Sequence, residues 1–210
     1  MPPPPKPSWM QPHGPGWREH DQRLVYDNPW IAVREYQAEA PTGARTVYGV
    51  VSFKNLAMGV LPIFDDGTIV LVGQARFPLR DYSWEIPEGG VPLDQDPLQG
   101  LKRELREEAG LEASDWRHAL SFQLSNSVSD ERGQGFIATG LSKVAAEPEA
   151  TESFALARVS FGEALEQALC GRISDMITLA MLLRAYHMAR EGELPEPLAR
   201  AMLHTAGRSR

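Results

Sequence analysis

The stretch that decides the fold reads Arg103-Glu104-Leu105-Arg106-Glu107-Glu108-Ala109-Gly110-Leu111. In a helix, Glu104, Glu107 and Glu108 stand three and four positions apart, so their side chains are neighbours on one surface. Like charges at this spacing destabilise an isolated helix by roughly 0.2–0.5 kcal/mol per pair. A divalent cation reverses that effect, because Mg²⁺ takes carboxylate oxygens as ligands. The triplet suggests a metal site, and the alternative is a solvated acidic face neutralised by Arg103 and Arg106.

The residues on either side of this stretch predict a capped helix that is pinned to a core. Asp96 is a good N-cap, Pro97 suits the first helical position, and Gly110 suits the C-terminal cap. Before the helix, Tyr82 to Ile86 reads as the end of a strand, and Gly89-Gly90 lets a ligand approach the main chain closely. Apolar residues recur at helical spacing at Leu98, Leu101, Leu105 and Ala109. We therefore expect the acidic edge of the helix to face a cleft beside the glycines.

The region from Gly89 to Leu111 resembles the signature of the Nudix hydrolase family. That signature is Gly, five residues, Glu, seven residues, and then Arg-Glu-apolar-any-Glu-Glu-any-Gly-apolar. Gly89 fits the first position, and Arg103 to Leu111 fit the last part at the right distance from it. Gln95 stands where the pattern has its first Glu, a residue that mostly supports the loop and helix in the family. Asp94 or Asp96 can supply charge nearby, so the resemblance still implies a metal-dependent phosphate site.

The rest of the chain alternates between strand and helix patterns, which fits the fold that the resemblance implies. That fold is an α/β Nudix α/β/α sandwich with a mixed sheet, and here it carries a small N-terminal β platform. Helices are expected at about 161–170 and 175–190. Strands are expected at 24–26, 30–36, 46–53, 57–64, 68–75, 118–124, 135–139 and 154–160. The expected organisation is a disordered Pro-rich tail at 1–20, the platform at 21–55, the Nudix hydrolase domain at 56–192 and a C-terminal tail at 193–210.

Composition excludes several classes of function. The chain of 210 residues is 42% hydrophobic and 23% charged, as expected of a globular enzyme domain. Its net charge of −7 argues against a non-specific grip on nucleic acid. No segment reaches the roughly 18 consecutive apolar residues of a membrane span. The single cysteine, Cys170, fits a reducing compartment, so we expect a cytoplasmic protein.

The resemblance assigns roles to the signature residues. Glu104 and Glu108 are the expected principal ligands of Mg²⁺ or Mn²⁺, and Glu107 is a further or water-mediated ligand. The carbonyl of Glu88 matches the main-chain ligand of the family. Arg103 is expected to orient the Glu104 carboxylate through paired hydrogen bonds, for which its planar fork is suited.

Residues outside the signature complete the expected site. In the resembled branch, the ADP-ribose and nucleotide-sugar pyrophosphatases, a Glu in a late acidic loop activates water or holds a further metal. The register against the strand that follows favours Glu152 for this role, with Glu149 as the alternative. The non-functional interpretation is an ordinary solvated acidic loop. The expected substrate contacts are Arg76, Glu85, Glu131, and Trp30 or Tyr26 stacking on the base from a partner subunit. Aromatic residues in an early strand are also common core residues.

The resulting hypothesis is a Mg²⁺-dependent hydrolase that cleaves the pyrophosphate bond of ADP-ribose or a related nucleoside diphosphate sugar. Its products are a nucleoside monophosphate and a sugar phosphate. The alternatives are GDP-mannose, other nucleotide sugars or dinucleotides as substrate, and a non-catalytic nucleotide sensor. The branch also implies a homodimer that exchanges its N-terminal platforms.

Overall fold

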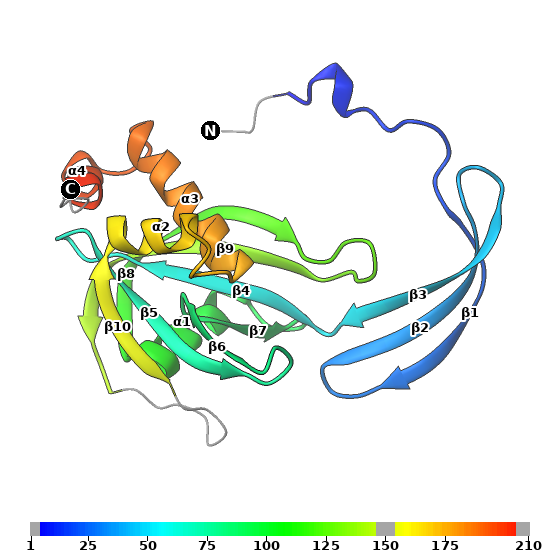
Figure 1. Cartoon of the computed structure of the whole chain (residues 1–210), viewed down its shortest axis with the longest axis horizontal. Coiled ribbons are helices and arrows are strands. Elements are labelled where there is room, and N and C mark those ends of the chain that lie inside the picture. Colours follow the sequence, from blue (N-terminus) through cyan, green and yellow to red (C-terminus); the bar gives the residue numbers. More distant parts are fainter. Residues whose placement is uncertain (1–4, 146–153, 205–210) are drawn as a thin grey trace. The chain divides into compact units, whose positions relative to one another are not determined.

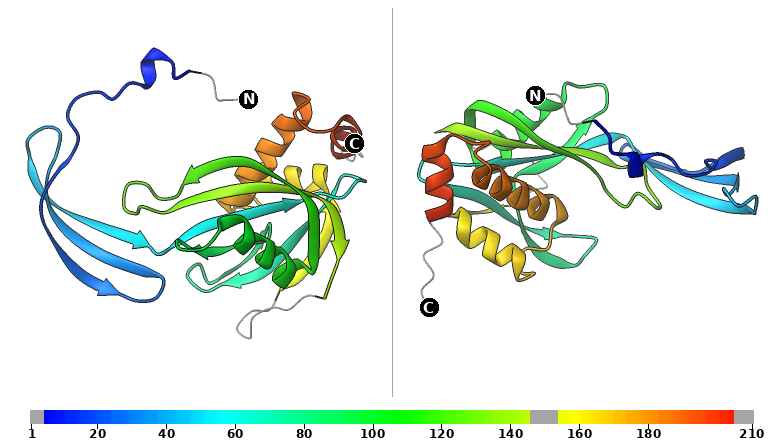
Figure 2. Two further views of the ribbon diagram at one scale, coloured as in Figure 1. Left: turned by 180° about the vertical axis from the view of Figure 1, so that it is seen from behind. Right: turned by 90° about the horizontal axis from the view of Figure 1, so that it is seen from above.

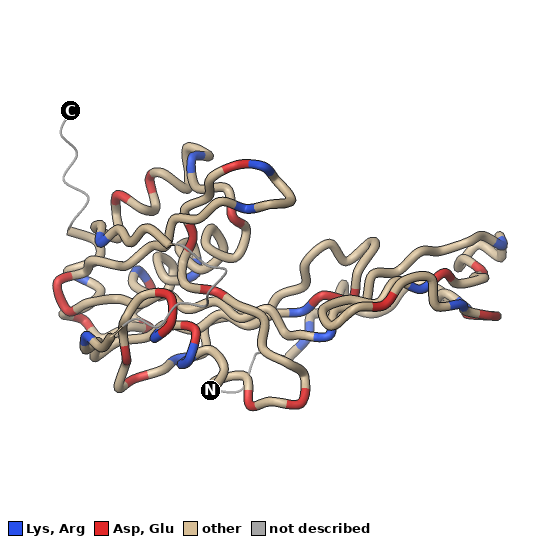
Figure 3. Tube along the Cα trace, turned by 90° about the horizontal axis from the view of Figure 1, so that it is seen from below, with Lys and Arg blue, Asp and Glu red and all other residues tan. Residues whose placement is uncertain are grey.

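The computed structural model describes residues 5–145 and 154–204, and the chain divides into two compact units (Figure 1). The first unit is Met1–Lys54 with Ser125–Asp130, and the second is Asn55–Leu124 with Glu131–Arg210. Acidic and basic positions are interspersed along the chain in each unit (Figure 3). Among the helices of the described part, none is long and apolar enough to cross a membrane.

The second unit contains two sheets. The larger has the order β7-β4-β9-β8, in which β4 and β9 are parallel and the other neighbours are antiparallel. The smaller is antiparallel, with the order β10-β5-β6. The strands are β4 (Asn55–Pro62), β5 (Thr68–Arg76), β6 (Asp81–Glu85), β7 (Glu88–Pro92), β8 (Leu111–Gln123), β9 (Arg132–Lys143) and β10 (Ala155–Ser160).

Helices cover both faces of these sheets. Viewed from behind, α1 (Pro97–Ala109) lies in front of the strands, and α2 (Phe161–Leu169) and α3 (Met176–Arg190) lie beyond them (Figure 2). Side chains alternate along a strand, so β4 and β5 each contribute to two cores. Met58, Val60 and Val70 pack with α1, whereas Leu61, Ile69 and Leu71 pack with the other helices. The α/β/α sandwich with a mixed sheet is therefore confirmed.

The C-terminal segment forms a further helix that its sequence pattern does not reveal. The expected tail at 193–210 contains α4 (Glu196–His204), with Leu198, Ala199 and Met202 buried. These three residues belong to the same core as α2 and α3. A helix of nine residues is too short to be stable alone, so this packing holds it in place.

The first unit is built on an antiparallel sheet with the order β1-β2-β3. Its strands are β1 (Arg18–Asp27), β2 (Ile31–Glu39) and β3 (Arg45–Phe53), and η1 (Ser8–Met10) precedes them. β1 begins at Arg18, inside the expected tail, because its residues pair with β2 as far as Arg18 opposite Glu39. Residues 125–130 join this unit, where the Val51 N–H donates to the Val128 carbonyl at 2.9 Å.

Candidate active site

The acidic surface of α1 is oriented by the ends and the apolar stripe of that helix. The Asp96 carboxylate accepts a hydrogen bond from the Gln99 N–H at 2.9 Å, and Pro97 is the first helical residue. Gly110 ends the helix with a φ of 61°, a left-handed conformation that favours glycine. Leu101 and Leu105 are fully buried. Because these features fix the rotation of the helix, Glu104 and Glu108 are held on the edge beside β7.

Glu108 connects α1 to the first residue of β7. Its side chain is 5% exposed, and its Oε2 accepts a hydrogen bond from the Glu88 N–H at 3.0 Å. A buried carboxylate needs such partners, because burial without them is costly. The bond places the signature carboxylate directly against the main chain of Glu88, whose carbonyl is an expected metal ligand.

Gly89 provides the space that Glu104 occupies. A Cβ at position 89 would lie 2.6 Å from both Cδ and Oε2 of Glu104, a separation that real Cβ atoms do not show. Gly89 and Gly90, expected to lie open to a ligand after the end of a strand, belong to a strand themselves, because they pair with Met58 and Ala57 of β4. Neither glycine has a positive φ. The close approach at Gly89 is therefore made by a carboxylate of the protein.

Arg103 lies beside the other two signature carboxylates. Its Nη2 donates to Glu104 Oε1 at 3.1 Å, and its Nε lies 3.5 Å from Glu107 Oε2. All three side chains are at least partly accessible to solvent. The guanidinium thus offsets part of the repulsion within the triplet and restrains the Glu104 carboxylate.

A second group of charges surrounds the Arg76 guanidinium. Its Nε lies 3.0 and 3.1 Å from the two oxygens of Glu85, and its Nη2 reaches Glu85 Oε2 at 2.5 Å. The same Nη2 donates to Glu88 Oε1 at 2.8 Å. Glu85 is 2% exposed. An expected substrate-binding arginine is therefore held by two carboxylates that flank the turn between β6 and β7.

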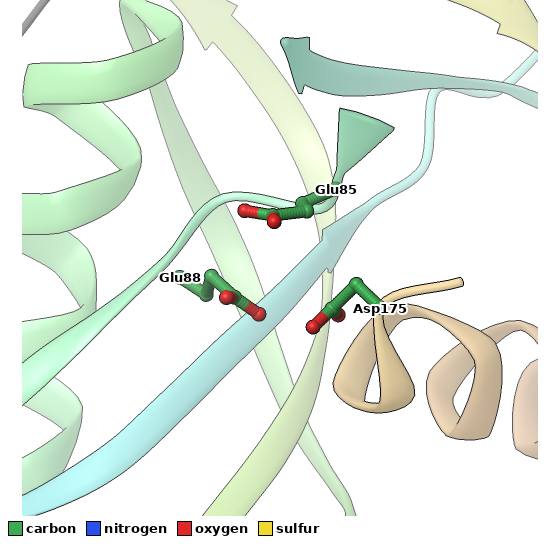
Figure 4. Close-up of side chains that lie close together, drawn as sticks. All are labelled: Glu85, Glu88 and Asp175. Carbon is green, nitrogen blue, oxygen red and sulfur yellow. The ribbon is translucent and has the colours of Figure 1, made fainter. Parts of the chain in front are cut away.

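Asp175 reaches the same group from a distant part of the chain. One carboxylate oxygen from each of Glu85, Glu88 and Asp175 lies within 4.8 Å of the others, and Figure 4 shows these three side chains pointing toward one another. Asp175 is the N-cap of α3, where it accepts from the Thr178 N–H at 2.7 Å. The sequence indicates a helix beginning at Asp175, but no local pattern indicates that this cap lies among the glutamates.

The ionisation of Glu88 is disfavoured by these surroundings. Burial, followed by the negative charges of Asp175 and Glu85, raises the pKa of Glu88 well above its usual range, and Arg76 opposes the shift. The Oε2 atom of Glu88 is buried and has no hydrogen-bond partner among the described residues. An orphaned carboxylate oxygen among other carboxylates fits the hard oxygen ligands that Mg²⁺ and Mn²⁺ prefer.

Glu88→Gln is expected to stabilise the cation-free protein at neutral pH by about 1 kcal/mol, since it removes a poorly compensated buried charge. The folded state holds the Glu88 proton more tightly than the unfolded chain. Wild-type stability therefore falls as the pH rises above the ordinary value of 4.5. The free energy of unfolding of the variant and of the wild type is measured with denaturant, in the presence of a chelator, at pH 5 and pH 8. The variant should exceed the wild type by more at pH 8 than at pH 5.

The matched control for this stability measurement is Glu112→Gln, which removes an exposed carboxylate paired with Arg106. Its effect is expected to stay within about 0.5 kcal/mol at both pH values. A Glu88→Gln protein that is less stable than the wild type at both pH values would show that the Arg76 ion pair outweighs the burial of the charge.

The remaining expected site residues lie elsewhere. Glu149 and Glu152 are outside the described residues. Tyr26 and Trp30 belong to the first unit, where they are 53% and 64% exposed and are not core residues. Glu131 belongs to the second unit, and its carbonyl accepts from the Leu124 N–H at 3.1 Å. The expected roles of these five residues stay predictions.

Comparison with known proteins identifies the fold and its family. A model of the NUDIX domain matches residues 53–174, which is more than half of the chain. The chain belongs to the Nudix hydrolase family. It is therefore a hydrolase, and the triplet on α1 together with Gly89 occupies the positions of the Nudix signature.

The relatives of this Nudix hydrolase carry different names. An "ADP-ribose pyrophosphatase" of Mycobacterium tuberculosis (strain ATCC 25618 / H37Rv) is 31% identical over 189 residues, covering 86% of this chain and 90% of the relative. A "Methanol dehydrogenase activator" of Bacillus methanolicus is 34% identical over 157 residues, covering 74% and 84%. A solved "ADP compounds hydrolase" superposes with a TM-score of 0.77 at 17% identity, covering 88% of this chain and all of that one. At 17% identity, the similarity to this solved structure shows a shared fold and nothing more.

Gln95, the departure from the Nudix signature, lies in the turn between β7 and α1. Its side chain is exposed, and its N–H donates to the Pro92 carbonyl at 3.0 Å. The turn and the Asp96 cap are both formed with glutamine at this position. The local structure that leads into the signature helix therefore does not require the missing glutamate.

Proposed function

We propose that the enzyme hydrolyses the pyrophosphate bond of ADP-ribose or a related nucleoside diphosphate sugar, giving a nucleoside monophosphate and a sugar phosphate. The observation that carries this proposal is the hydrogen bond between α1 and β7, which the buried Glu108 carboxylate accepts from the Glu88 main chain. This hydrogen bond holds the acidic edge of the helix in one place. The relative named as an ADP-ribose pyrophosphatase, which is similar over 86% of this chain, supports this choice of substrate.

The proposed cofactor is Mg²⁺ or Mn²⁺. Glu104, Glu107 and Glu108 would hold it, with the Glu88 carbonyl as a main-chain ligand. The fit rests on an all-oxygen donor set and on the orphaned Glu88 Oε2 beside it. When bound, a divalent cation withdraws negative charge from phosphoryl oxygens.

The protein's own side chains have two tasks in the proposed reaction. Arg103 restrains Glu104, as its 3.1 Å hydrogen bond indicates. Arg76 is proposed to bind a phosphate. Its side chain is 35% exposed, and its Nη1 donates no hydrogen bond to another described residue. Positioning and electrostatics of this kind supply most of the catalysis in phosphoryl transfer.

A substrate panel tests the proposed function. With Mg²⁺ present, ADP-ribose is expected to be converted to AMP and ribose 5-phosphate at least tenfold more efficiently than GDP-mannose, a dinucleoside polyphosphate or an oxidised nucleoside triphosphate. Efficiency is measured as kcat/KM from product chromatography. A higher kcat/KM for GDP-mannose would make GDP-mannose the substrate in place of ADP-ribose. Tight binding of ADP-ribose without any product would favour a non-catalytic nucleotide sensor.

The general base is proposed to be Glu152, with Glu149 as the alternative. A positioned general base contributes about 100- to 10,000-fold to the rate of a reaction. Glu152→Gln is therefore expected to lower kcat by at least about 100-fold, whereas Glu149→Gln changes it less than threefold. Steady-state rates of the two variants at saturating Mg²⁺ decide between them. A larger loss of kcat in Glu149→Gln than in Glu152→Gln would assign the general base to Glu149. If neither variant loses activity, the loop is an ordinary solvated surface with no part in catalysis.

We also propose a homodimer formed through the first unit. All ten residues of β1 are exposed in the single chain, among them Leu24, Val25 and Tyr26. An exposed edge strand with apolar side chains is a template for pairing with another chain. Light scattering coupled to size-exclusion chromatography should give twice the chain mass, and a single chain mass at micromolar concentration would contradict the dimer. Stacking of Tyr26 or Trp30 on the base depends on it.

The enzyme is proposed to act in the cytoplasm. Cys170 is its single cysteine and is a free, exposed thiol, as suits a compartment that keeps thiols reduced. Fractionation of cells that make the full chain should recover the protein with cytoplasmic markers, and recovery with secreted or membrane fractions would refute this.

A further inference from the structure

The first turn of α3 is tied to the active-site strands at two points. The Ile86 N–H, in the turn between β6 and β7, donates to Thr178 Oγ1 at 2.9 Å, and Thr178 is fully buried. One turn earlier, the Asp175 carboxylate lies within 4.8 Å of Glu85 and Glu88 oxygens. The start of α3 is thus fixed against the residues that hold Arg76.

Two functions of Asp175 can be separated chemically. As an N-cap, it needs only an oxygen that accepts from the Thr178 N–H, and asparagine or serine supplies one equally well. As a member of the cluster in Figure 4, it contributes a negative charge that no helix cap requires. If Asp175 served only as a helix cap, removing its negative charge while keeping the cap oxygen would have no effect on the site.

The charges around Arg76 do not balance when all the side chains are ionised. Glu85, Glu88 and Asp175 supply three carboxylates, and Arg76, whose guanidinium pairs with Glu85 and Glu88, supplies one positive charge. The negative charge of Asp175 therefore adds to two carboxylates that already share one guanidinium. Glu88 in turn is bonded through its N–H to Glu108 on the signature helix.

We propose that Asp175 is a positioning residue of the cation site: its negative charge, held within 4.8 Å of a Glu88 carboxylate oxygen, strengthens divalent-cation binding at α1 although Asp175 is not itself a ligand. The proposal rests on the proposed function only in that α1 holds a divalent cation. A charge close to the site attracts the cation, since the attraction between charges persists over several ångströms in a partly buried setting.

Direct binding of Mn²⁺ to the substrate-free protein, followed by electron paramagnetic resonance of the unbound ion, tests this role. Asp175→Asn keeps the cap oxygen and removes the charge. We expect it to raise the Kd for Mn²⁺ by roughly fivefold or more, with an unchanged number of bound ions per chain. Asp175→Ser, a second good cap without charge, should give the same increase.

The matched control is Asp96→Asn at the start of α1. Asp96 caps its helix through the same kind of bond, to the Gln99 N–H, but its side chain is exposed. Its variant is expected to leave the Kd within twofold of wild type, and thermal unfolding should show all three variants folded. Equal Kd values for the Asp175 and Asp96 variants would overturn the proposal.

Two further outcomes complete the test. Loss of one bound ion per chain in Asp175→Asn would make Asp175 a direct ligand, which also contradicts the positioning role. A wild-type protein that binds Mn²⁺ but cleaves no nucleoside diphosphate sugar would refute the proposed function, while the ratio of Kd values would still support the role of Asp175.

Discussion

Glu108→Gln is expected to lower kcat by about 100- to 1000-fold, the range seen when one electrostatic group of an active site is removed. Glu108 is 5% exposed and accepts the Glu88 N–H through Oε2 at 3.0 Å. A glutamine can still accept that hydrogen bond through its amide oxygen, so α1 should stay attached to β7. The substitution removes the negative charge and replaces the other carboxylate oxygen with an NH2 group. The measurement is kcat for ADP-ribose over a range of Mg²⁺ concentrations, together with the unfolding temperature.

The control for this loss is again Glu112→Gln, which removes a negative charge close in sequence to Glu108. Glu112 is exposed at the start of β8 and forms its ion pair with Arg106. Its variant should keep kcat within threefold of wild type. If Glu108→Gln keeps similar activity while remaining folded, the acidic edge of α1 is not the metal-binding surface and the proposed mechanism fails.

The signature helix was predictable because all the signals that define it are local. Asp96, Pro97 and Gly110 mark its ends, and the structure begins α1 at Pro97 and ends it at Ala109. Of the apolar stripe, Leu101, Leu105 and Ala109 are buried. Capping and periodicity act within a few residues of each other, so a sequence displays them directly.

The arrangement around Arg76 was less predictable because it joins segments far apart in the chain. Glu85 and Asp175 are ninety positions apart, and they meet only after the sheets and α3 have packed. Arg76 was expected to face substrate, but its ion pairs with Glu85 and Glu88 depend on the register between β5 and β6, in which Arg76 stands opposite Asp81. Tertiary packing sets these contacts, and local pattern carries little information about them.

Tertiary packing also explains why some strands, and the C-terminal segment, are more ordered in the structure than the sequence predicts. β8 and β9 are longer than expected because they pair with each other from Leu111–Lys143 to Gln123–Arg132, which extends both beyond their apolar segments. α4 is stable because Met202 and its neighbours complete the core of α2 and α3. Pairing and packing therefore extended structure into segments whose own sequence reads as weakly ordered.

Gly89→Ala is expected to reduce kcat by about 100-fold while leaving the fold intact, because misplacing a reactive group by about 1 Å can cost that much. The backbone at Gly89 does not have a positive φ, so alanine is not strained there. Its Cβ would instead lie 2.6 Å from the Glu104 carboxylate. That carboxylate ends a flexible side chain, which can move away at little cost in stability but leaves its place beside β7.

Gly90→Ala separates this effect from a general effect of alanine in β7. Its Cβ would lie 2.9 Å from Asn55 Nδ2, the end of a side chain that can rotate, and its three nearest atoms all belong to Asn55. We expect kcat within threefold of wild type for Gly90→Ala, and similar unfolding temperatures for both variants. If the two variants lose activity equally, Gly89 is required for the strand and not for Glu104. If Gly89→Ala alone loses activity, the signature glycine serves to leave space for a metal-binding carboxylate.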